Sequence, residues 1–167
     1  NPGPDWNPKQ RPGDNLYSDC AIALDADTGA LKWHFQFTPN DGYDYDSVQV
    51  PVLADLNWKG TPTKAMLWAN RNGYFYVLDR ATGRFLLGEP FVKVNWASGL
   101  DANGRPIQTR QPPGTPTYPG NQGGTNWYPP SFSPRTGLFY FSAWVDYASV
   151  FRREFQEFTQ GRNFAGG

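Results

Sequence analysis

The sequence has almost no thiol or imidazole chemistry. Among its 167 residues it contains one cysteine, Cys20, and one histidine, His34. A lone cysteine forms no internal disulfide, and a catalytic thiol needs a histidine close to it in the fold. Both residues fall in alternating apolar stretches typical of strands, so we interpret both as structural. The redox compartment stays open on this evidence alone.

Long apolar runs and an excess charge of either sign are also absent. The longest apolar stretches are a few residues, well short of the roughly 20 that cross a bilayer, so we expect no membrane span. The 15 basic and 15 acidic side chains cancel, which gives no electrostatic reason to expect nucleic acid as a partner. No basic segment followed by an apolar one opens the chain, so no targeting peptide is visible.

Glycine, proline and aromatic residues are abundant instead. The chain has 18 Gly, 16 Pro and 7 Trp, and helical periodicity is almost absent. This composition favours many short strands and tight turns, and therefore an all-β fold. Residues 101–124 are rich in Pro and Gly and predict a long loop excursion, which in compact folds is usually functional or disordered. Residues 151–167 predict an irregular tail, within which Phe151, Phe155 and Phe158 have the spacing of a short helix.

Three Thr-Gly pairs recur at one interval along the chain. They fall at Thr28-Gly29, Thr82-Gly83 and Thr136-Gly137, and the differences 82 − 28 and 136 − 82 are both 54. Each pair lies between an apolar strand and a strand with aromatics, where Gly suits a positive φ, so each predicts a β-hairpin. A repeat of this kind predicts a β-propeller with four-stranded antiparallel blades. We therefore expect residues 1–167 to be a fragment of a single propeller domain, with about three blades in equivalent positions.

The stretch "TPNDGYDYDSVQVP", residues 38–51, gathers Asp41, Asp44 and Asp46 in front of a Val-rich run. In an extended chain, side chains two apart point to one face, so Asp44 and Asp46 can present two anions to one point. Like charges that close resist joint ionisation unless a cation relieves them. The stretch therefore indicates either a cation site or a solvated acidic turn before a strand.

Several motifs, in order, resemble pyrroloquinoline quinone (PQQ)-dependent alcohol dehydrogenases of the methanol/ethanol type. The pattern from Ala23 to Trp33, "ALDADTGALKW", is similar to the tryptophan-docking motif of eight-bladed quinoprotein propellers, in which a Trp of one blade packs against its neighbour. The resemblance extends from Asn1 to about Trp144. It is carried by the segments "NPGPDWNPKQRPGDNLYSD", "WHFQFTPNDGYDYDSVQVPVL", "LWANRNGYFYVLDRATG" and "GGTNWYPPSFSPRTGLFY".

The resemblance implies a role for each matching residue. Asp44 matches the catalytic base, Asn1 matches an amide metal ligand, and Arg71 matches the basic residue beside the reactive quinone oxygens. Asn126 and Trp127 match positions that contact the cofactor. Without the family, Arg71 is equally a polar strand end and Asn126 a turn former. The family's Glu ligand, its Trp beneath the cofactor and its cysteine pair have no counterpart here, so we expect this chain alone to be inactive.

Asp46 carries a further implication of the same resemblance. Calcium enzymes of the family commonly have a small uncharged residue two positions after the catalytic Asp, whereas lanthanide-dependent members have a second Asp. Attraction between a cation and a carboxylate scales with the product of their charges, so a trivalent ion gains more from Asp46 than calcium does. The metal set implied is therefore Asn1, Asp44 and Asp46, with calcium or a lanthanide as the ion.

The function implied is oxidation of an alcohol to an aldehyde, with hydride transfer to PQQ. A cation and a guanidinium polarise the quinone, and a carboxylate removes the hydroxyl proton. The family also implies a small alcohol substrate, an external acceptor such as a cytochrome c, the remainder of the propeller and a periplasmic location. The alternative is a non-enzymatic propeller scaffold of the outer-membrane assembly type, which shares the docking repeat. A sugar dehydrogenase on the same propeller is disfavoured by the alcohol-type motifs.

Overall fold

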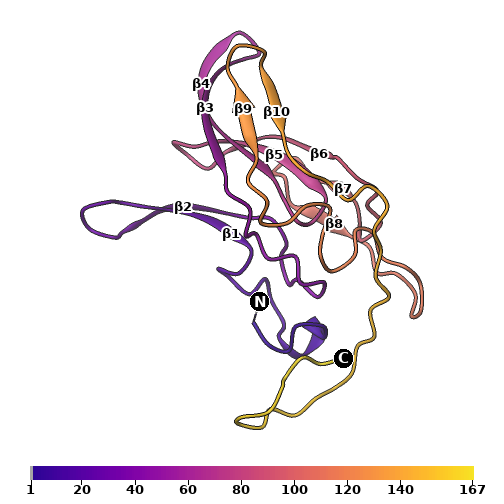
Figure 1. Cartoon of the computed structure of the whole chain (residues 1–167). Coiled ribbons are helices and arrows are strands. Elements are labelled where there is room, and N and C mark those ends of the chain that lie inside the picture. The colour runs from indigo at the N-terminus through magenta and orange to yellow at the C-terminus, as the bar shows by residue number, and fades with distance from the viewer. Residues whose placement is uncertain (1) are drawn as a thin grey trace.

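The computed structural model describes residues 2–167, so the predicted metal ligand Asn1 lies outside the described residues. The described chain is nearly all β, with one short 3₁₀ helix, η1 (Pro8–Gln10). Its strands are β1 (Cys20–Leu24), β2 (Leu31–Gln36), β3 (Val52–Trp58), β4 (Thr61–Ala69), β5 (Tyr74–Asp79), β6 (Phe85–Pro90), β7 (Ala97–Leu100), β8 (Pro106–Gln108), β9 (Ser131–Ser133) and β10 (Leu138–Tyr140) (Figure 1). All named strand pairs are antiparallel, as predicted. Within residues 2–167, no helix has the length and apolar character that a membrane crossing requires.

One sheet is a complete four-stranded blade, with the strand order β3-β4-β5-β6. The other sheets are two-stranded pairs, β1-β2, β7-β8 and β9-β10. The predicted fold class is confirmed, but the described chain holds one four-stranded blade rather than three. The segments beside the two-stranded pairs are rich in Pro, which has no N–H to donate to a ladder. The excursion at 101–124 is also less irregular than expected, because it contains β8.

The blade is packed on both of its faces. Side chains of β5 alternate, so Tyr76 and Leu78 join one buried cluster while Val77 joins the other. The first cluster includes Phe37 and is covered by aromatic residues of β2. The second is covered by aromatic residues of β9 and β10. The blade therefore lies between two neighbouring hairpins, as a blade of a propeller does.

The first two Thr-Gly turns share one geometry. In each, the Asp four residues before Gly accepts a hydrogen bond at its backbone oxygen from that Gly N–H, at 2.8 Å for both Gly29 and Gly83. The φ angles of these glycines are +71° and +75°. Trp33, on β2, packs over Gly83, where an added Cβ would lie 2.7 Å from the indole ring. The predicted docking of a Trp on the neighbouring blade is therefore confirmed.

The third Thr-Gly turn has the same local geometry, with the Gly137 N–H bonded to the Ser133 oxygen at 2.8 Å, but its hairpin has a different position in the fold. Gly137 has the expected positive φ of +70°, but its hairpin β9–β10 packs beside β3. In Figure 1 the tip of this hairpin lies next to the tip joining β3 and β4, away from the tip joining β5 and β6. The constant spacing of 54 residues therefore marks three similar turns, and the prediction of three equivalent blade positions is wrong for Gly137.

The predicted helix in the tail is absent from the described residues. Phe151 packs against Trp6 and Tyr43, with ring centroids 5.6 and 5.4 Å apart, whereas Phe155 and Phe158 are exposed. The tail backbone is held by Asn7, whose Nδ2 donates to the Glu154 oxygen at 2.8 Å, and by the Glu154 N–H, which donates to the Gly166 oxygen at 2.7 Å. One anchored aromatic residue, rather than an apolar helical stripe, determines this conformation.

Candidate functional site

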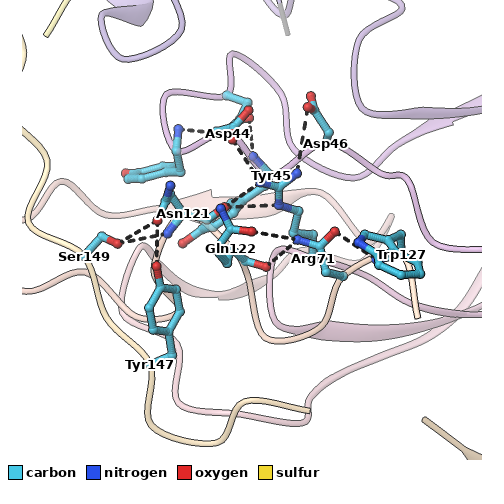
Figure 2. Close-up of polar contacts among 12 residues, drawn as sticks. Asp44, Tyr45, Asp46, Arg71, Asn121, Gln122, Trp127, Tyr147 and Ser149 are labelled. Carbon is cyan, nitrogen blue, oxygen red and sulfur yellow. Dashed lines mark hydrogen bonds and ion pairs between the residues drawn. The ribbon is translucent and has the colours of Figure 1, made fainter. Parts of the chain in front are cut away.

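The site is centred on Arg71, in the turn that joins β4 to β5. Its side chain is only 8% exposed, and Nη2 lies 2.9 Å from Oδ2 of Asp44. Nη1 lies 3.9 Å from Oδ2 of Asp46. Nε and Nη2 both donate to the backbone oxygen of Asn121, at 3.1 and 2.8 Å (Figure 2). The guanidinium therefore joins the acidic loop to the long Pro/Gly-rich loop.

The acidic loop is shaped by Asp41 rather than by strand geometry. Residues 41–51 contain no strand, and Asp44 has a φ of +64°, so the assumption of an extended chain is wrong here. The buried carboxylate of Asp41 accepts the N–H of Tyr43 at 2.9 Å and that of Tyr45 at 2.7 Å. These two bonds fold the loop so that Asp44 and Asp46 nevertheless both face Arg71 (Figure 2).

Negative charge accumulates around this loop. Burial raises the pKa of Asp44 to about 6; Arg71 partly offsets the effect, and Asp46 adds to it. Asp19, just before β1, is buried, and neither of its carboxylate oxygens is hydrogen-bonded within residues 2–167. Burial, followed by repulsion from Asp41 and Asp46, raises the pKa of Asp19 to about 8. Asp19 ends the segment "NPGPDWNPKQRPGDNLYSD", but the family resemblance did not single it out as a site residue.

The carboxylates fit a hard cation, although they do not complete a ligand set. Among residues 2–167, no three Asp, Glu, His or Cys side chains are grouped so as to hold a metal ion. Asp44 and Asp46 supply carboxylate oxygens of the type that calcium-like ions prefer, on the same side of Arg71. Asp19, whose pKa is raised to about 8, is mainly protonated at neutral pH, and a cation bound nearby would favour its ionised form. This region can therefore supply part of a metal site.

Asn126 and Trp127 lie on the loop that also carries Asn121. The Asn126 side chain is bonded within this loop: its Nδ2 donates to the Gln122 oxygen at 3.0 Å, and its Oδ1 accepts the Trp127 N–H at 2.9 Å. The Trp127 ring is 65% exposed. Asn126 thus has the turn-forming role that its sequence context also allowed, while the open face of Trp127 can contact a ligand.

Sequence reasoning missed the residues that hold Asn121. Its Oδ1 accepts hydrogen bonds from the Tyr147 hydroxyl at 2.7 Å and from the Ser149 hydroxyl at 3.0 Å (Figure 2). Gly123 leaves the space that the Arg71 side chain occupies, because an added Cβ would collide with Cγ of Arg71. No motif marks this arrangement, since the contacts join segments far apart in the chain.

Residues 1–95, more than half of the chain, match the family model of the PQQ glucose/ethanol/alcohol dehydrogenase β-propeller domain. The chain belongs to this PQQ propeller family. Its relatives include the quinohemoprotein alcohol dehydrogenase of Comamonas testosteroni, which is 47% identical over 148 residues, 84% of this chain and 21% of the relative.

Two further members of the PQQ family extend the comparison. The lanthanide-dependent methanol dehydrogenase of Methylacidiphilum fumariolicum is 44% identical over 84% of this chain and 24% of its own length. The solved structure of quinohemoprotein alcohol dehydrogenase ADHIIG from Pseudomonas putida matches with a TM-score of 0.84 and 35% identity, over 97% of this chain and 25% of that one. The chain thus spans about a quarter or less of the length of these relatives.

Proposed function

We propose that the complete protein containing this chain oxidises alcohols to aldehydes with PQQ as the hydride acceptor. The observation that carries this proposal is the partly buried Arg71–Asp44 pair, with its N–O distance of 2.9 Å, in a chain of the PQQ propeller family. A carboxylate held beside a guanidinium supplies a proton acceptor next to a donor of charge-assisted hydrogen bonds. Both groups are needed where an alcohol loses a proton and a hydride together.

Asp44 acts as the general base in this proposal. With a pKa raised to about 6 it is mainly ionised at neutral pH, yet still basic enough to accept the hydroxyl proton of an alcohol. Its backbone has a positive φ of +64° and its carboxylate lies 2.9 Å from Arg71, and the two bonds that Asp41 accepts hold the loop in that form. Asp41 is therefore a positioning residue for Asp44.

Arg71 supplies positive charge toward the cofactor. Its Nε and Nη2 groups are occupied by Asn121 and Asp44, whereas Nη1 donates no hydrogen bond within residues 2–167 and makes only a long ion pair, of 3.9 Å, with Asp46. Nη1 is therefore available to donate to the developing negative charge on a quinone oxygen. PQQ, when bound, would supply the two-electron acceptor, with the exposed face of Trp127 and the Asn126 turn among its contacts.

Asp44 and Asp46, together with Asn1, would hold a calcium or lanthanide ion that acts as a Lewis acid. Asp46 favours the trivalent ion, because the second carboxylate adds more attraction for a higher charge. The 44% sequence identity to a lanthanide-dependent methanol dehydrogenase supports the trivalent ion. We also propose a periplasmic protein that passes electrons to an external acceptor such as a cytochrome c, following the family resemblance.

Reconstitution of the complete protein tests the proposal. With PQQ and calcium or lanthanum it should reduce a dye when alcohol is added. Asp44→Asn should retain PQQ absorbance yet lower turnover by roughly 10²- to 10⁴-fold. Asp55→Asn is the matched control, since Asp55 is an exposed residue of β3 whose carboxylate pairs with Arg80 at 2.9 Å. An absence of any PQQ-dependent absorbance or dye reduction would favour the scaffold function instead, for which Trp33 docking on Gly83 suffices.

A further inference from the structure

The orientation of the Arg71 guanidinium depends on one backbone oxygen. The Asn121 carbonyl accepts Nε at 3.1 Å and Nη2 at 2.8 Å. Because the N–H groups of a guanidinium diverge in one rigid plane, two bonds to a single oxygen determine the direction of the remaining donors. A second N–H of Nη2 then reaches Asp44 at 2.9 Å. Movement of this carbonyl would therefore turn Arg71 away from both the base and the cofactor.

Asn121, whose backbone carbonyl binds Arg71, is itself held through its side chain and its N–H by two residues far along the chain. Tyr147 Oη donates to Asn121 Oδ1 at 2.7 Å, and Ser149 Oγ donates to the same atom at 3.0 Å. Ser149 Oγ also accepts the Asn121 N–H at 3.1 Å. A β-bridge between Thr117 and Ser149, with N–O distances of 2.8 and 3.1 Å, fixes the backbones beside each other.

We propose that Asn121, Tyr147 and Ser149 form a clamp that positions the Arg71 guanidinium for the reaction. None of the three donates to or accepts from the carboxylates of Asp44 or Asp46 among the contacts of residues 2–167, so they are positioning residues. This inference rests on the proposed function of Arg71. It gives the long loop and the segment after β10 a specific role, since the hydrogen bonds at Asn121 join the two.

The surrounding loop explains why a clamp is required. Between β8 and β9 the chain contains no named strand, so the Asn121 backbone is restrained by isolated contacts, such as the bond from the Gly120 N–H to the Tyr147 oxygen at 2.9 Å, and not by a continuous ladder. Gly123, with a φ of +82°, brings the same loop into contact with the Arg71 side chain. A displacement of about 1 Å in a positioning group can lower turnover roughly 100-fold, so small loop motions at Asn121 matter for the reaction.

The test compares variants of the complete protein loaded with PQQ and lanthanum or calcium. Tyr147→Phe combined with Ser149→Ala removes the hydroxyl bonds to Asn121. We expect kcat to fall at least roughly tenfold per bound PQQ, while KM for the alcohol changes less than about twofold. Ser149→Thr retains the hydroxyl and should retain kcat. Tyr140→Phe, at a half-exposed tyrosine of β10, is the matched control and should leave both constants unchanged.

An unchanged kcat per bound PQQ in the double variant would overturn the proposal, even if the protein melts at a lower temperature or binds less cofactor. The single variant Tyr147→Phe provides the same comparison if the double variant does not fold. A crystal structure of the cofactor-free double variant gives an independent readout. We expect the guanidinium to leave the Asn121 carbonyl, and an unmoved guanidinium overturns the clamp. A wild-type protein without PQQ-dependent turnover would overturn the proposed function, while the crystal structure still decides the clamp.

Discussion

The indole ring of Trp33 packs directly over Gly83, in the space that a side chain at position 83 would occupy. The ring comes from β2, and the glycine closes the turn between β5 and β6. Glycine is required there for two separate reasons, its φ of +75° and its lack of a Cβ.

Replacement of Gly83 by Ala should therefore be more costly than the same change at Gly137. Both glycines have similar positive φ, but an added Cβ at Gly137 meets no atom within 4 Å, whereas at Gly83 it meets Trp33 at 2.7 Å. We expect Gly137→Ala to cost about 1 kcal/mol and Gly83→Ala roughly 2 to 4 kcal/mol of unfolding free energy. Urea unfolding followed by tryptophan fluorescence measures both, and equal losses would contradict this account of docking.

Asp46→Ala should change the metal preference of the complete enzyme. The wild-type protein should be activated by a light lanthanide well above calcium, because the second carboxylate favours the higher charge. Removal of that carboxylate should shift the preference toward calcium, whereas Asp44→Ala should abolish activity with either ion. Dye reduction at saturating concentrations of each ion measures the ratio. Equal activation of the wild-type protein, with a ratio untouched by Asp46→Ala, is the contrary result.

The pH dependence of kcat/KM should show the ionisation of Asp44. Below its pKa, which burial raises to about 6, Asp44 is protonated and cannot accept the hydroxyl proton, so activity should fall as the pH falls. A bound cation favours the ionised carboxylate and shifts this limb to lower pH. We therefore expect an acid limb with an apparent pKa at or below about 6. A limb above pH 7 would be inconsistent with Asp44 as the base.

Asp19→Asn should stabilise the metal-free protein, and more strongly at higher pH. The pKa of Asp19 is raised from 3.8 to about 8 by burial, so across this window the folded protein holds a proton that the unfolded chain releases. The free energy of unfolding therefore decreases as the pH rises through this window, and the decrease is complete above about pH 8, where Asp19 must ionise in the folded protein. Asn does not titrate, and we expect a gain of roughly 2 to 5 kcal/mol at pH 9 with little gain at pH 4.

Thermal unfolding of the metal-free protein at pH 4, 6 and 9 measures this dependence. Asp27→Asn is the matched control, because Asp27 is exposed in the turn between β1 and β2. A gain for Asp19→Asn that is the same at all three pH values would mean that the variant acts through packing and not through the buried charge.

Local chemistry explains which features the sequence predicted correctly. The turns at Gly29 and Gly83 depend on an Asp, a Thr and a Gly within five residues, and Asp25 and Asp79 each accept their own Thr N–H, at 3.0 and 3.2 Å. Such turns are visible in sequence because every contact is local. The equal spacing of the Thr-Gly pairs predicted the position of the third hairpin wrongly, because spacing carries no information about which strands pair. The hairpin at Gly137 packs beside β3.

The site was predictable only where a motif marks it. The resemblance singled out Arg71, Asp44 and Asp46, and these three side chains do lie together. Tyr147 reaches Asn121 across 26 positions, and neither stands in a motif, so no periodicity or composition could pair them. The role of Asp19 was not predicted for a different reason: its raised pKa arises from burial, which only the folded chain creates.

The Arg71 side chain acts as a non-covalent cross-link between two long loops that carry little regular structure of their own. It holds the loop around Asp44 and the loop around Asn121 through bonds of 2.8 to 3.1 Å. A quinone that binds the Nη1 group, which lies 3.9 Å from Asp46, adds to this cross-link only when both loops are in place. Because such a ligand binds only when both loops are closed, it stabilises them against local unfolding. The temperature at which these loops unfold should therefore rise with ligand concentration.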